Sequence, residues 1–294
     1  MKAPPIEGAT VGIVGLGLMG GAFAIALKEQ GIVTAAGSIL AYDMDAASLD
    51  AARAEGVIDE GFQDCAAMLA RCDLVFLCLY PRTLLRFMAE RMQDFKRGAL
   101  LADIAGIKGS IAAAMEAQLR EDLDFIPGHP MAGKELPKQI PASFREARRC
   151  DFQGKNYILT PLQRNSPENL AYLRDIITRM GFSRITETTP AEHDSSIAFT
   201  SQLCHVIAAA LIDCQADTGI TRFGGGSFED LTRIAMFNAP MWTELFLENS
   251  DLLLERIEQF KGSLDFLTTL ISTDRGTELE DRLRMLRERR SEMV

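Results

Sequence analysis

The chain has 294 residues, 47% of them hydrophobic and 24% charged, which is the balance of an ordinary soluble globular protein. This length suggests two domains. Forty-one acidic and 31 basic residues give a net charge of −10, so a nucleic-acid-binding protein is not expected. The six cysteines have neither CxxC nor zinc-site spacing, so we predict reduced thiols, no metal site and a cytoplasmic location.

An uncharged segment near the N-terminus, Ala9–Leu27, is long enough to suggest a signal peptide or a membrane span. Glycines interrupt it, and little positive charge precedes it. A glycine-rich nucleotide-binding loop therefore explains the segment better. We see no other apolar run that approaches membrane length, and we expect no membrane association.

The first half alternates short apolar runs with helix-like stretches, which is typical of a parallel α/β sheet. Between the first two predicted strands and after the second we expect helices over Met19–Gln30 and Asp45–Glu55. The predicted strands are Thr10–Val14, Ile39–Tyr42, Leu74–Leu79, Ala99–Ala102, Asp124–Ile126 and Tyr157–Leu159, with a short edge at Ile185–Glu187.

After Thr189 the pattern becomes helical. Helical spacing of apolar residues predicts helices over Ser196–Cys214 and Ser250–Ile271, and a last helix that contains Leu279, Leu283 and Leu286. We therefore predict an α/β Rossmann-type domain over residues 1–188 and an all-α domain over residues 189–294. The long apolar faces of the second domain suggest a homodimer.

A G-x-G-x-x-G sequence follows the first predicted strand directly and opens the first helix. Its glycines allow a tight turn and a close approach to a pyrophosphate, and the helix N-terminus supplies free N–H groups. Asp43 ends the second strand, where a carboxylate would accept ribose hydroxyls and repel a 2′-phosphate. We predict NAD rather than NADP, while another nucleotide or none is the alternative. The candidate cofactor-binding residues are Gly15, Leu16, Gly17, Leu18, Met19, Gly20 and Asp43, with Tyr80 and Pro81, which end the third strand.

Only three histidines occur in the chain: His129, His193 and His205. His129 lies in a Gly-His-Pro turn after the predicted strand Asp124–Ile126, at the sheet edge where ligands bind, which favours a functional role. His193 and His205 would lie about 18 Å apart on one straight helix, too far to share a metal. Taken alone, each of these two is more typical of a structural residue.

Arg233 lies between apolar neighbours, nine residues before Trp242, the single tryptophan. The spacing leaves two interpretations open: a guanidinium paired with an acid of the protein, or a clamp for a substrate carboxylate.

Taken together, these sequences resemble the prephenate/arogenate dehydrogenases of tyrosine biosynthesis, in family order across nearly the whole chain. The matching segments are Gly15–Gly20, Asp103 with Lys108, Gly128–Glu135, Tyr157–Pro161, Glu192–Asp194, Ser201–His205, Phe228–Ala235 with Trp242, and Asn249.

The resemblance implies an oxidative decarboxylation of a cyclohexadienol that carries a ring carboxylate and a 4-hydroxyl. Hydride leaves C4 for NAD, the hydroxyl becomes a carbonyl, and loss of CO2 makes the ring aromatic. By the same resemblance, His129 accepts the hydroxyl proton and Arg233 binds the substrate carboxylate. His193, His205 and Glu135 would line the substrate pocket.

The sequence departs from the family pattern in three places. Gly106 stands where many members have a serine that helps to bind the hydroxyl, and the usual Ser-His-Leu-Pro-His block here reads Ser-Gln-Leu-Cys-His, with Gln202 and Cys204 as the two differences. Glu229 stands where some prephenate-using members carry a lysine; if it faces the pocket, it would disfavour prephenate and suit arogenate, whose side chain adds an ammonium group. We therefore count Gly106 and Glu229 among the substrate-binding candidates.

Prephenate dehydrogenase is the leading prediction, with arogenate dehydrogenase as its nearest alternative. A β-hydroxyacid dehydrogenase would use a catalytic lysine in the helical domain, where Lys261 is the single lysine. An NAD-sensing module without turnover would not need both His129 and Arg233. The chain ends at Val294 without room for an appended regulatory or mutase domain, so we expect a monofunctional enzyme.

Overall fold

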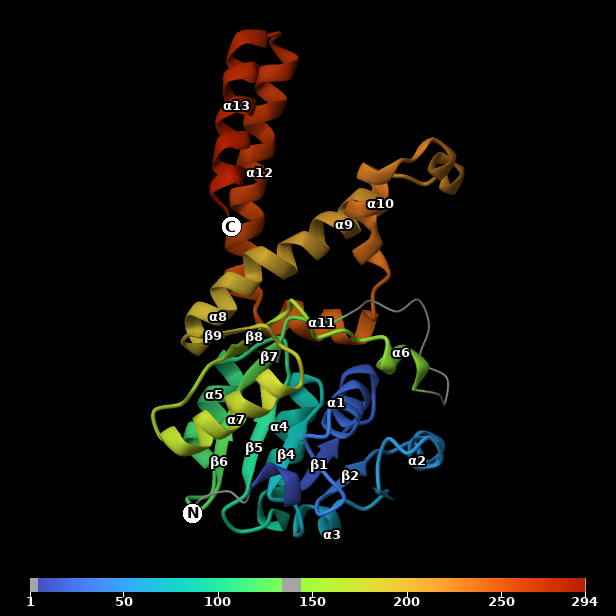
Figure 1. Ribbon diagram of the computed structural model, residues 1–294. Helices are drawn as coiled ribbons and strands as arrows, with labels where there is room; N and C mark the ends of the chain where they lie inside the picture. Colours follow the sequence, from blue (N-terminus) through green and yellow to red (C-terminus); the bar gives the residue numbers. More distant parts are fainter. Residues whose placement is uncertain (1–4, 134–143, 294) are drawn as a thin grey trace.

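The computed structural model describes residues 5–133 and 144–293. Its first half is built on a six-stranded parallel sheet with the strand order 3-2-1-4-5-6 of a dinucleotide-binding fold (Figure 1). In spatial order the strands are β3 (Glu60–Phe62), β2 (Ser38–Tyr42), β1 (Thr10–Val14), β4 (Leu74–Leu77), β5 (Leu100–Asp103) and β6 (Asp124–Ile126).

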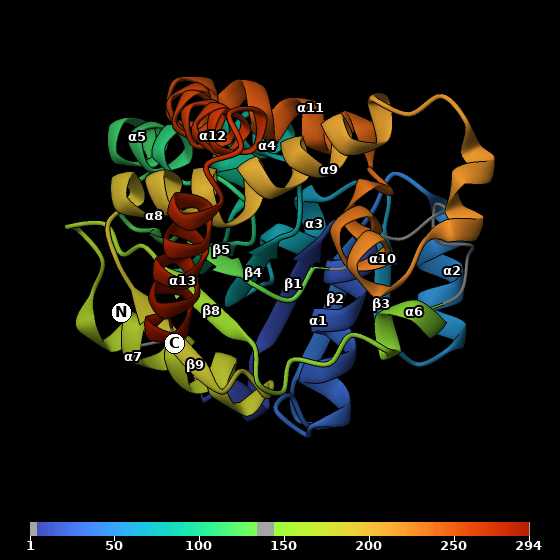
Figure 2. The same ribbon diagram turned by 90° about the horizontal axis from the view of Figure 1, so that it is seen from above.

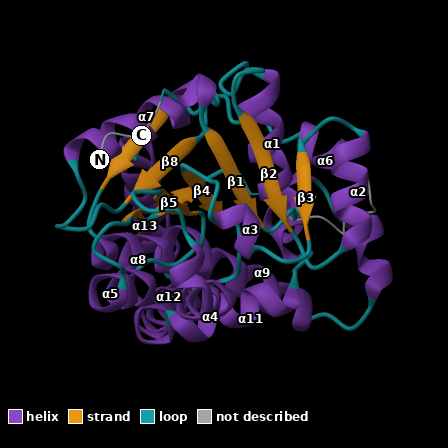
Figure 3. Ribbon diagram, turned by 90° about the horizontal axis from the view of Figure 1, so that it is seen from below, coloured by secondary structure: helices purple, strands orange, loops and turns teal. Residues whose placement is uncertain are grey.

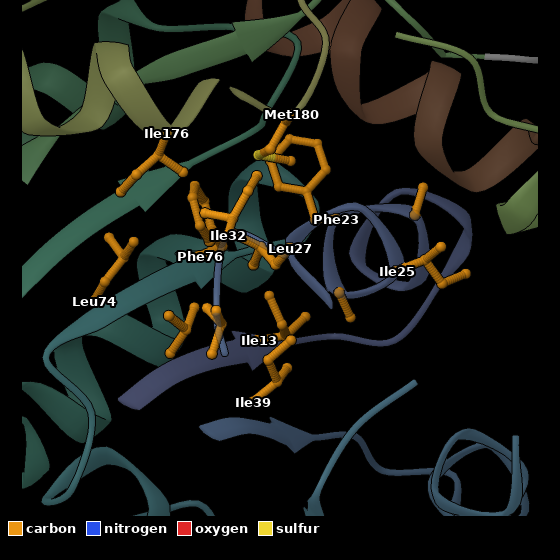
Figure 4. Packing of buried hydrophobic residues seen from close by; sticks show 14 of the residues in the cluster. Ile13, Phe23, Ile25, Leu27, Ile32, Ile39, Leu74, Phe76, Ile176 and Met180 are labelled. Atoms are coloured by element: carbon orange, nitrogen blue, oxygen red, sulfur yellow. The ribbon is translucent and has the colours of Figure 1, made fainter. Parts of the chain in front are cut away.

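Alternation along the buried strands divides the core into two layers. In β4, for example, Leu74 and Phe76 face one layer, and Val75 and Leu77 face the other. The first layer includes α1 (Leu18–Glu29), α2 (Ala46–Ala54) and α7 (Pro167–Arg179), and Figure 4 shows its packing around Phe23 and Phe76. The second layer includes α3 (Ala66–Leu69), α4 (Pro81–Arg91) and α5 (Gly109–Gln118).

A second, three-stranded sheet lies beside the first (Figure 3). Its strands are β7 (Gly128–Pro130), β8 (Asn156–Leu159) and β9 (Arg184–Glu187); β7 is antiparallel to β8, and β8 is parallel to β9. The expectation that Tyr157–Leu159 is a sixth strand of the parallel sheet is therefore wrong. Such short strands carry no period that indicates their partner, so the pairing is decided by tertiary contacts.

His129 is also placed differently from the prediction. It lies within β7, paired with Ile158 of β8, rather than in a turn at the end of β6. The short strand β3 was not predicted, because only Phe62 among its residues is apolar. The other predicted strands and the first two helices are confirmed, with small shifts at their ends.

The remaining chain is helical. Its elements are α8 (Pro190–Ile197), the π turn η3 (Ala198–Gln202), α9 (Leu203–Asp213), η4 (Thr218–Phe223), α10 (Gly226–Thr232), η5 (Arg233–Ala235), α11 (Ala239–Glu248), α12 (Ser250–Ser272) and α13 (Gly276–Glu292). The first domain also holds η1 (Ile6–Gly8), η2 (Met92–Asp94) and α6 (Arg145–Arg148). We propose the domain boundary at 188/189, between β9 and α8.

The helical part forms two projecting arms above the sheet. Helices α12 and α13 form one arm, and α9 with α10 forms the other (Figure 1). The last two predicted helices are confirmed, whereas the helix predicted from Ser196 begins earlier, at Pro190, and continues through the π turn. Seen from above, α9 continues from α8 across the molecule, and the chain then returns to α10 (Figure 2).

The continuous helical stretch Pro190–Asp213 corrects one expectation, because its 24 residues are long and apolar enough to cross a membrane. One such helix is weak evidence for a membrane span, since length and composition are the only criteria that it meets. Its buried polar residues His193, Asp194 and Gln202 contact other elements of the protein, as in a helix of a soluble fold.

Candidate active site

The loop between β1 and α1 requires glycine at two positions. Gly15 has a φ of +93°, and its N–H donates to Tyr42 O at 2.8 Å. A Cβ on Gly20 would lie 1.9 Å from the carbonyl oxygen of Gly15. These two glycines therefore build the turn itself.

Gly17 is open to an incoming ligand. No described atom lies within 4 Å of the position that a Cβ would take there. Gly17 is the N-cap residue of α1, and no side chain caps this helix, so the first N–H groups of α1, including those of half-buried Leu18 and Met19, remain available. The residues present thus fit a pyrophosphate at the helix N-terminus.

Asp43 is held at the end of β2 by two backbone groups. Its Oδ2 accepts the N–H of Leu16 at 2.7 Å and its Oδ1 accepts the N–H of Asp45 at 2.9 Å. Each oxygen retains a second lone pair for a ribose hydroxyl. Its neighbours are the exposed Met44 and the acid Asp45, neither of which would offset a 2′-phosphate.

Tyr80 and Pro81 lie where β4 meets α4, and the helical part contacts this point. The Tyr80 hydroxyl accepts a hydrogen bond from Asn238 Nδ2 at 2.7 Å, and Pro81 is the buried first residue of α4. The carboxylate of Glu244 on α11 accepts the N–H of Arg82 at the same helix end. These contacts place the helical part over the carboxyl edge of the sheet.

His129 is half-buried, and its Nδ1 lies 2.9 Å from Nε2 of His193 on α8. Gly106, in the loop after β5, borders the same ring, since a Cβ there would lie 3.9 Å from His129 Cε1 and 3.1 Å from Leu245 Cδ2. The structure therefore brings together β7, the β5–α5 loop, α8 and α11 around His129.

A buried ion pair lies beneath this cluster. Lys108 Nζ donates to Asp103 Oδ2, and both side chains have 0% exposure. Asp103 also accepts the N–H of Ala105 at 2.9 Å and that of Gly128, the residue before His129, at 3.2 Å. The pair thus connects the end of β5 with the strand that holds His129.

Asp194, next to His193, joins the helical part to α5. Its two oxygens accept the N–H groups of Lys108 and Gly109, at 2.8 and 2.7 Å, and Oδ1 is 2.7 Å from Nδ1 of His193. The carboxylate therefore caps the first turn of α5, where it also interacts favourably with the helix dipole.

The surroundings lower the pKa of both imidazoles, which favours their neutral forms. Desolvation, the His193 ring and the Lys108 cation lower the pKa of His129 well below its ordinary value of 6.5. Burial is also the main cause that lowers the pKa of His193, against the raising effect of Asp194. Burial lowers the pKa of Lys108 as well, against the opposing effect of Asp103.

His205 lies on α9, after the π turn. Its Nδ1 lies 2.9 Å from the carbonyl oxygen of Ser201, and its ring stacks on Trp242 with centroids 3.6 Å apart. A buried amide network supports this region: Asn249 Nδ2 donates to Gln202 Oε1 at 2.7 Å and to Asp194 O at 3.0 Å. This network was not predicted, although Asn249 lies in one of the matching segments.

Glu229 and Arg233 lie on the α9–α10 arm, both exposed. Within residues 5–133 and 144–293, Arg233 forms no ion pair with an acid of the chain, which speaks against the first of its two interpretations. The structure gives neither residue a contact with His129. Glu135 lies outside the described residues.

Comparison with known families adds to this geometry. The family model described as the prephenate dehydrogenase nucleotide-binding domain matches residues 23–186, and that of the prephenate dehydrogenase dimerization domain matches residues 189–285. The chain belongs to the prephenate dehydrogenase family. Within this family, the helical part is the dimerization domain.

Individual relatives agree with the family models. A cyclohexadienyl dehydrogenase of Zymomonas mobilis is 31% identical over 90% of this chain and 89% of its own length. A crystal structure of prephenate dehydrogenase from Aquifex aeolicus, in complex with hydroxyphenyl propionate and NAD+, has a TM-score of 0.84 and 30% identity, and it covers 97% of this chain and 98% of that one. A Synechocystis arogenate dehydrogenase has a TM-score of 0.77 and 27% identity, and it covers 97% of this chain and 100% of that one.

A 3-hydroxyisobutyrate dehydrogenase of Salmonella typhimurium shares the fold alone, with 14% identity and a TM-score of 0.57. In this chain Lys261, the lysine that a β-hydroxyacid dehydrogenase would need, lies exposed on α12 and pairs with Glu258 at 2.7 Å. This position gives no support to the β-hydroxyacid alternative.

Sequence analysis assigned no individual roles to Asp103, Lys108 and Asp194. A signal was present for Asp194, since it directly follows a candidate histidine. No sequence signal indicates that Lys108 is fully buried, because a lysine is buried only where the fold provides a partner.

Proposed function

We propose that this protein catalyses the NAD-dependent oxidative decarboxylation of prephenate to 4-hydroxyphenylpyruvate in tyrosine biosynthesis. The observation that supports it most directly is the half-buried imidazole of His129 at the edge of a dinucleotide-binding sheet, where desolvation lowers its pKa. The Aquifex aeolicus structure holds NAD+ and a hydroxyphenyl compound in the same fold.

The cofactor would bind along the loop from Gly15 to Gly20, with its pyrophosphate at Gly17 and its adenosine ribose at Asp43. The residues of this loop would hold NAD+, which would supply the acceptor for the hydride from C4 of the substrate. Tyr80 and Pro81 line the same edge, after β4.

His129 would accept the proton of the 4-hydroxyl while the hydride departs. A neutral imidazole can do so, and an imidazolium cannot, so the lowered pKa of His129 suits this role. Gly106 leaves the space next to the ring without a side chain.

Arg233 would bind a substrate carboxylate, because a guanidinium matches carboxylate geometry and no acid of the described residues pairs with it. We assign His193, His205 and Glu135 to the substrate pocket. The cation of Arg233 is needed to bind an anionic substrate, because the protein as a whole carries a charge of −10.

The deciding experiment is an NADH absorbance assay of the purified protein with NAD+ and prephenate. We expect His129→Asn to lose most of its turnover, roughly 100-fold or more as for other general bases, and to keep its affinity for NAD. No absorbance change with prephenate or arogenate would refute the enzyme. Full activity of His129→Asn would refute the assignment of His129.

Arogenate is the second candidate substrate, favoured by the acid at position 229. If Glu229 faces the substrate side chain, Glu229→Lys shifts the ratio of kcat/KM toward prephenate. An unchanged ratio would remove this argument. We place the enzyme in the cytoplasm as a homodimer, in keeping with its six cysteines, which form no disulfide with one another, and its dimerization domain.

A further inference from the structure

Asp194, His193 and His129 form an unbroken chain of close polar contacts from α8 to β7. Asp194 Oδ1 lies 2.7 Å from His193 Nδ1, and His193 Nε2 lies 2.9 Å from His129 Nδ1. The His193 side chain has no exposure, so no solvent can replace either partner. Each imidazole thus has its hydrogen-bonding state determined by a neighbour within the protein.

The direction of these hydrogen bonds follows from Asp194. This carboxylate also accepts the N–H groups of Lys108 and Gly109, so it is an acceptor toward His193 as well. Nδ1 of His193 must therefore carry a hydrogen. In a neutral ring Nε2 is then the acceptor, and it can take only a hydrogen bond donated by Nδ1 of His129.

We propose that Asp194 and His193 are positioning residues that hold His129 in the Nδ1–H tautomer, which leaves its Nε2 lone pair free to accept the substrate hydroxyl proton. This inference rests on the proposed function for the identity of the proton donor. It refines the assignment of His193 to the substrate pocket, because a side chain without exposure acts through His129 rather than by its own contact with the substrate.

The same arrangement stabilises the product of proton transfer. After Nε2 of His129 takes the hydroxyl proton, the Nδ1 proton of His129 can pass to Nε2 of His193. The positive charge then lies next to the Asp194 carboxylate and farther from the reacting ring. Two protons move in this step, the hydroxyl proton to Nε2 of His129 and the Nδ1 proton of His129 to Nε2 of His193, and no further reactant is needed.

Charged groups on the neighbouring elements agree with this direction. Lys108, from the β5–α5 loop, lies near both rings and disfavours a resident positive charge on either one. Its partner Asp103 accepts from Lys108 and two backbone N–H groups and raises the pKa of His193 only through space, so Asp194 is the carboxylate in direct contact with His193. The two imidazole rings are thus neutral before turnover, and a positive charge forms on one of them only during turnover.

The first test is the tautomer of each ring, measured by long-range 1H–15N NMR of the full-length protein labelled with 15N-histidine. Three histidines give a spectrum that single substitutions can assign. We expect Nδ1 protonated and Nε2 unprotonated on both His129 and His193 near neutral pH. His205 is the internal control, because its Nδ1 must donate to the carbonyl of Ser201. Protonation of Nε2 on His129 would overturn the proposal.

The second test compares two substitutions that leave Asp194 in place. In His193→Gln the side-chain oxygen can still accept from His129 Nδ1, whereas in His193→Leu nothing can. We expect kcat to fall at least about tenfold further in His193→Leu, with the KM for NAD unchanged and a mixed tautomer at His129, since general-base efficiency depends on the correct protonation state. Equal kcat values for the two variants, both folded by circular dichroism, would overturn the proposal.

These outcomes distinguish the proposed roles of Asp194 and His193 from the proposed function. The tautomers are read without substrate, so the expected spectrum together with no NADH formation would refute the function and leave the hydrogen-bond arrangement standing. Turnover of prephenate by a protein whose resting His129 carries its hydrogen on Nε2 would support the function and refute the hydrogen-bond arrangement.

Discussion

Lys108 and Asp103 form an ion pair in which neither side chain reaches solvent, directly beneath the strand that holds His129. Such a pair is costly to desolvate, and its loss on one side leaves a buried charge without compensation. A substitution of either Lys108 or Asp103 is therefore expected to destabilise the site.

We predict that Lys108→Met lowers the free energy of unfolding by about 3–5 kcal/mol, because it leaves Asp103 buried and unpaired. Urea unfolding followed by circular dichroism measures this change. The control is Lys28→Met, which breaks the Lys28–Asp59 pair, whose side chains are 35% and 42% exposed. It should cost no more than about 1 kcal/mol. An equal decrease in the free energy of unfolding of the two variants would contradict the prediction that burial makes the Lys108–Asp103 pair the more costly one to break.

The glycine loop offers a matched pair of substitutions. Gly17→Ala meets no described atom of the protein, so it should fold normally and bind NAD at least tenfold more weakly, because its methyl group lies where the pyrophosphate approaches. Gly20→Ala should also lower stability, because its Cβ would collide with the carbonyl of Gly15. Thermal unfolding and NAD titration distinguish the two. Unchanged NAD affinity in Gly17→Ala would refute the placement of the pyrophosphate.

The pH dependence follows from the lowered pKa of His129. The neutral ring is the active form, so kcat/KM should stay flat as the pH falls to 6.5 and decline only when the pH passes the lowered pKa. Initial rates between pH 5 and pH 8 test this. An acid limb centred at or above 6.5 would contradict it, and the residual activity of His129→Asn should lack this limb.

His129 and His193 also make the stability of the protein depend on pH. Their folded pKa values are lowered relative to the unfolded chain, so the unfolded state binds more protons below pH 6.5. Their contribution to stability is fully present above 6.5 and is lost as the pH falls. His129→Asn should therefore unfold with a smaller pH dependence between pH 5 and pH 7 than the unsubstituted protein.

The dimer should depend on an apolar stripe of α12 formed by Phe260, Leu264 and Ile271, all exposed in the protomer. Their spacing places them on one helix face, and an exposed apolar face of this kind indicates a contact surface. Leu264→Asp should shift the mass measured by light scattering at micromolar concentration toward the monomer. Gln259→Glu adds a charge on another face of α12 and should remain dimeric, and a dimeric Leu264→Asp would exclude this face.

Much of the α/β domain could be predicted from local pattern. A buried strand, a glycine turn and a helix follow one another in Thr10–Glu29, and each is encoded by its own residues. The pairing in the second sheet could not be predicted, because strands of three or four residues show no period that indicates their partner, and β8 pairs with both β7 and β9 through contacts distant in sequence.

The sequence by itself determined the nucleotide loop, the acid at the end of β2, the change from mixed to helical structure and the importance of three histidines, because these depend on residue type and near neighbours. Only the tertiary structure decided that His129 contacts His193 rather than His205, and that Asp194 caps a helix 85 residues earlier in the chain. Hydrogen bonds over such separations follow from how the helical part lies on the sheet. No local sequence pattern indicates how the helical part lies on the sheet.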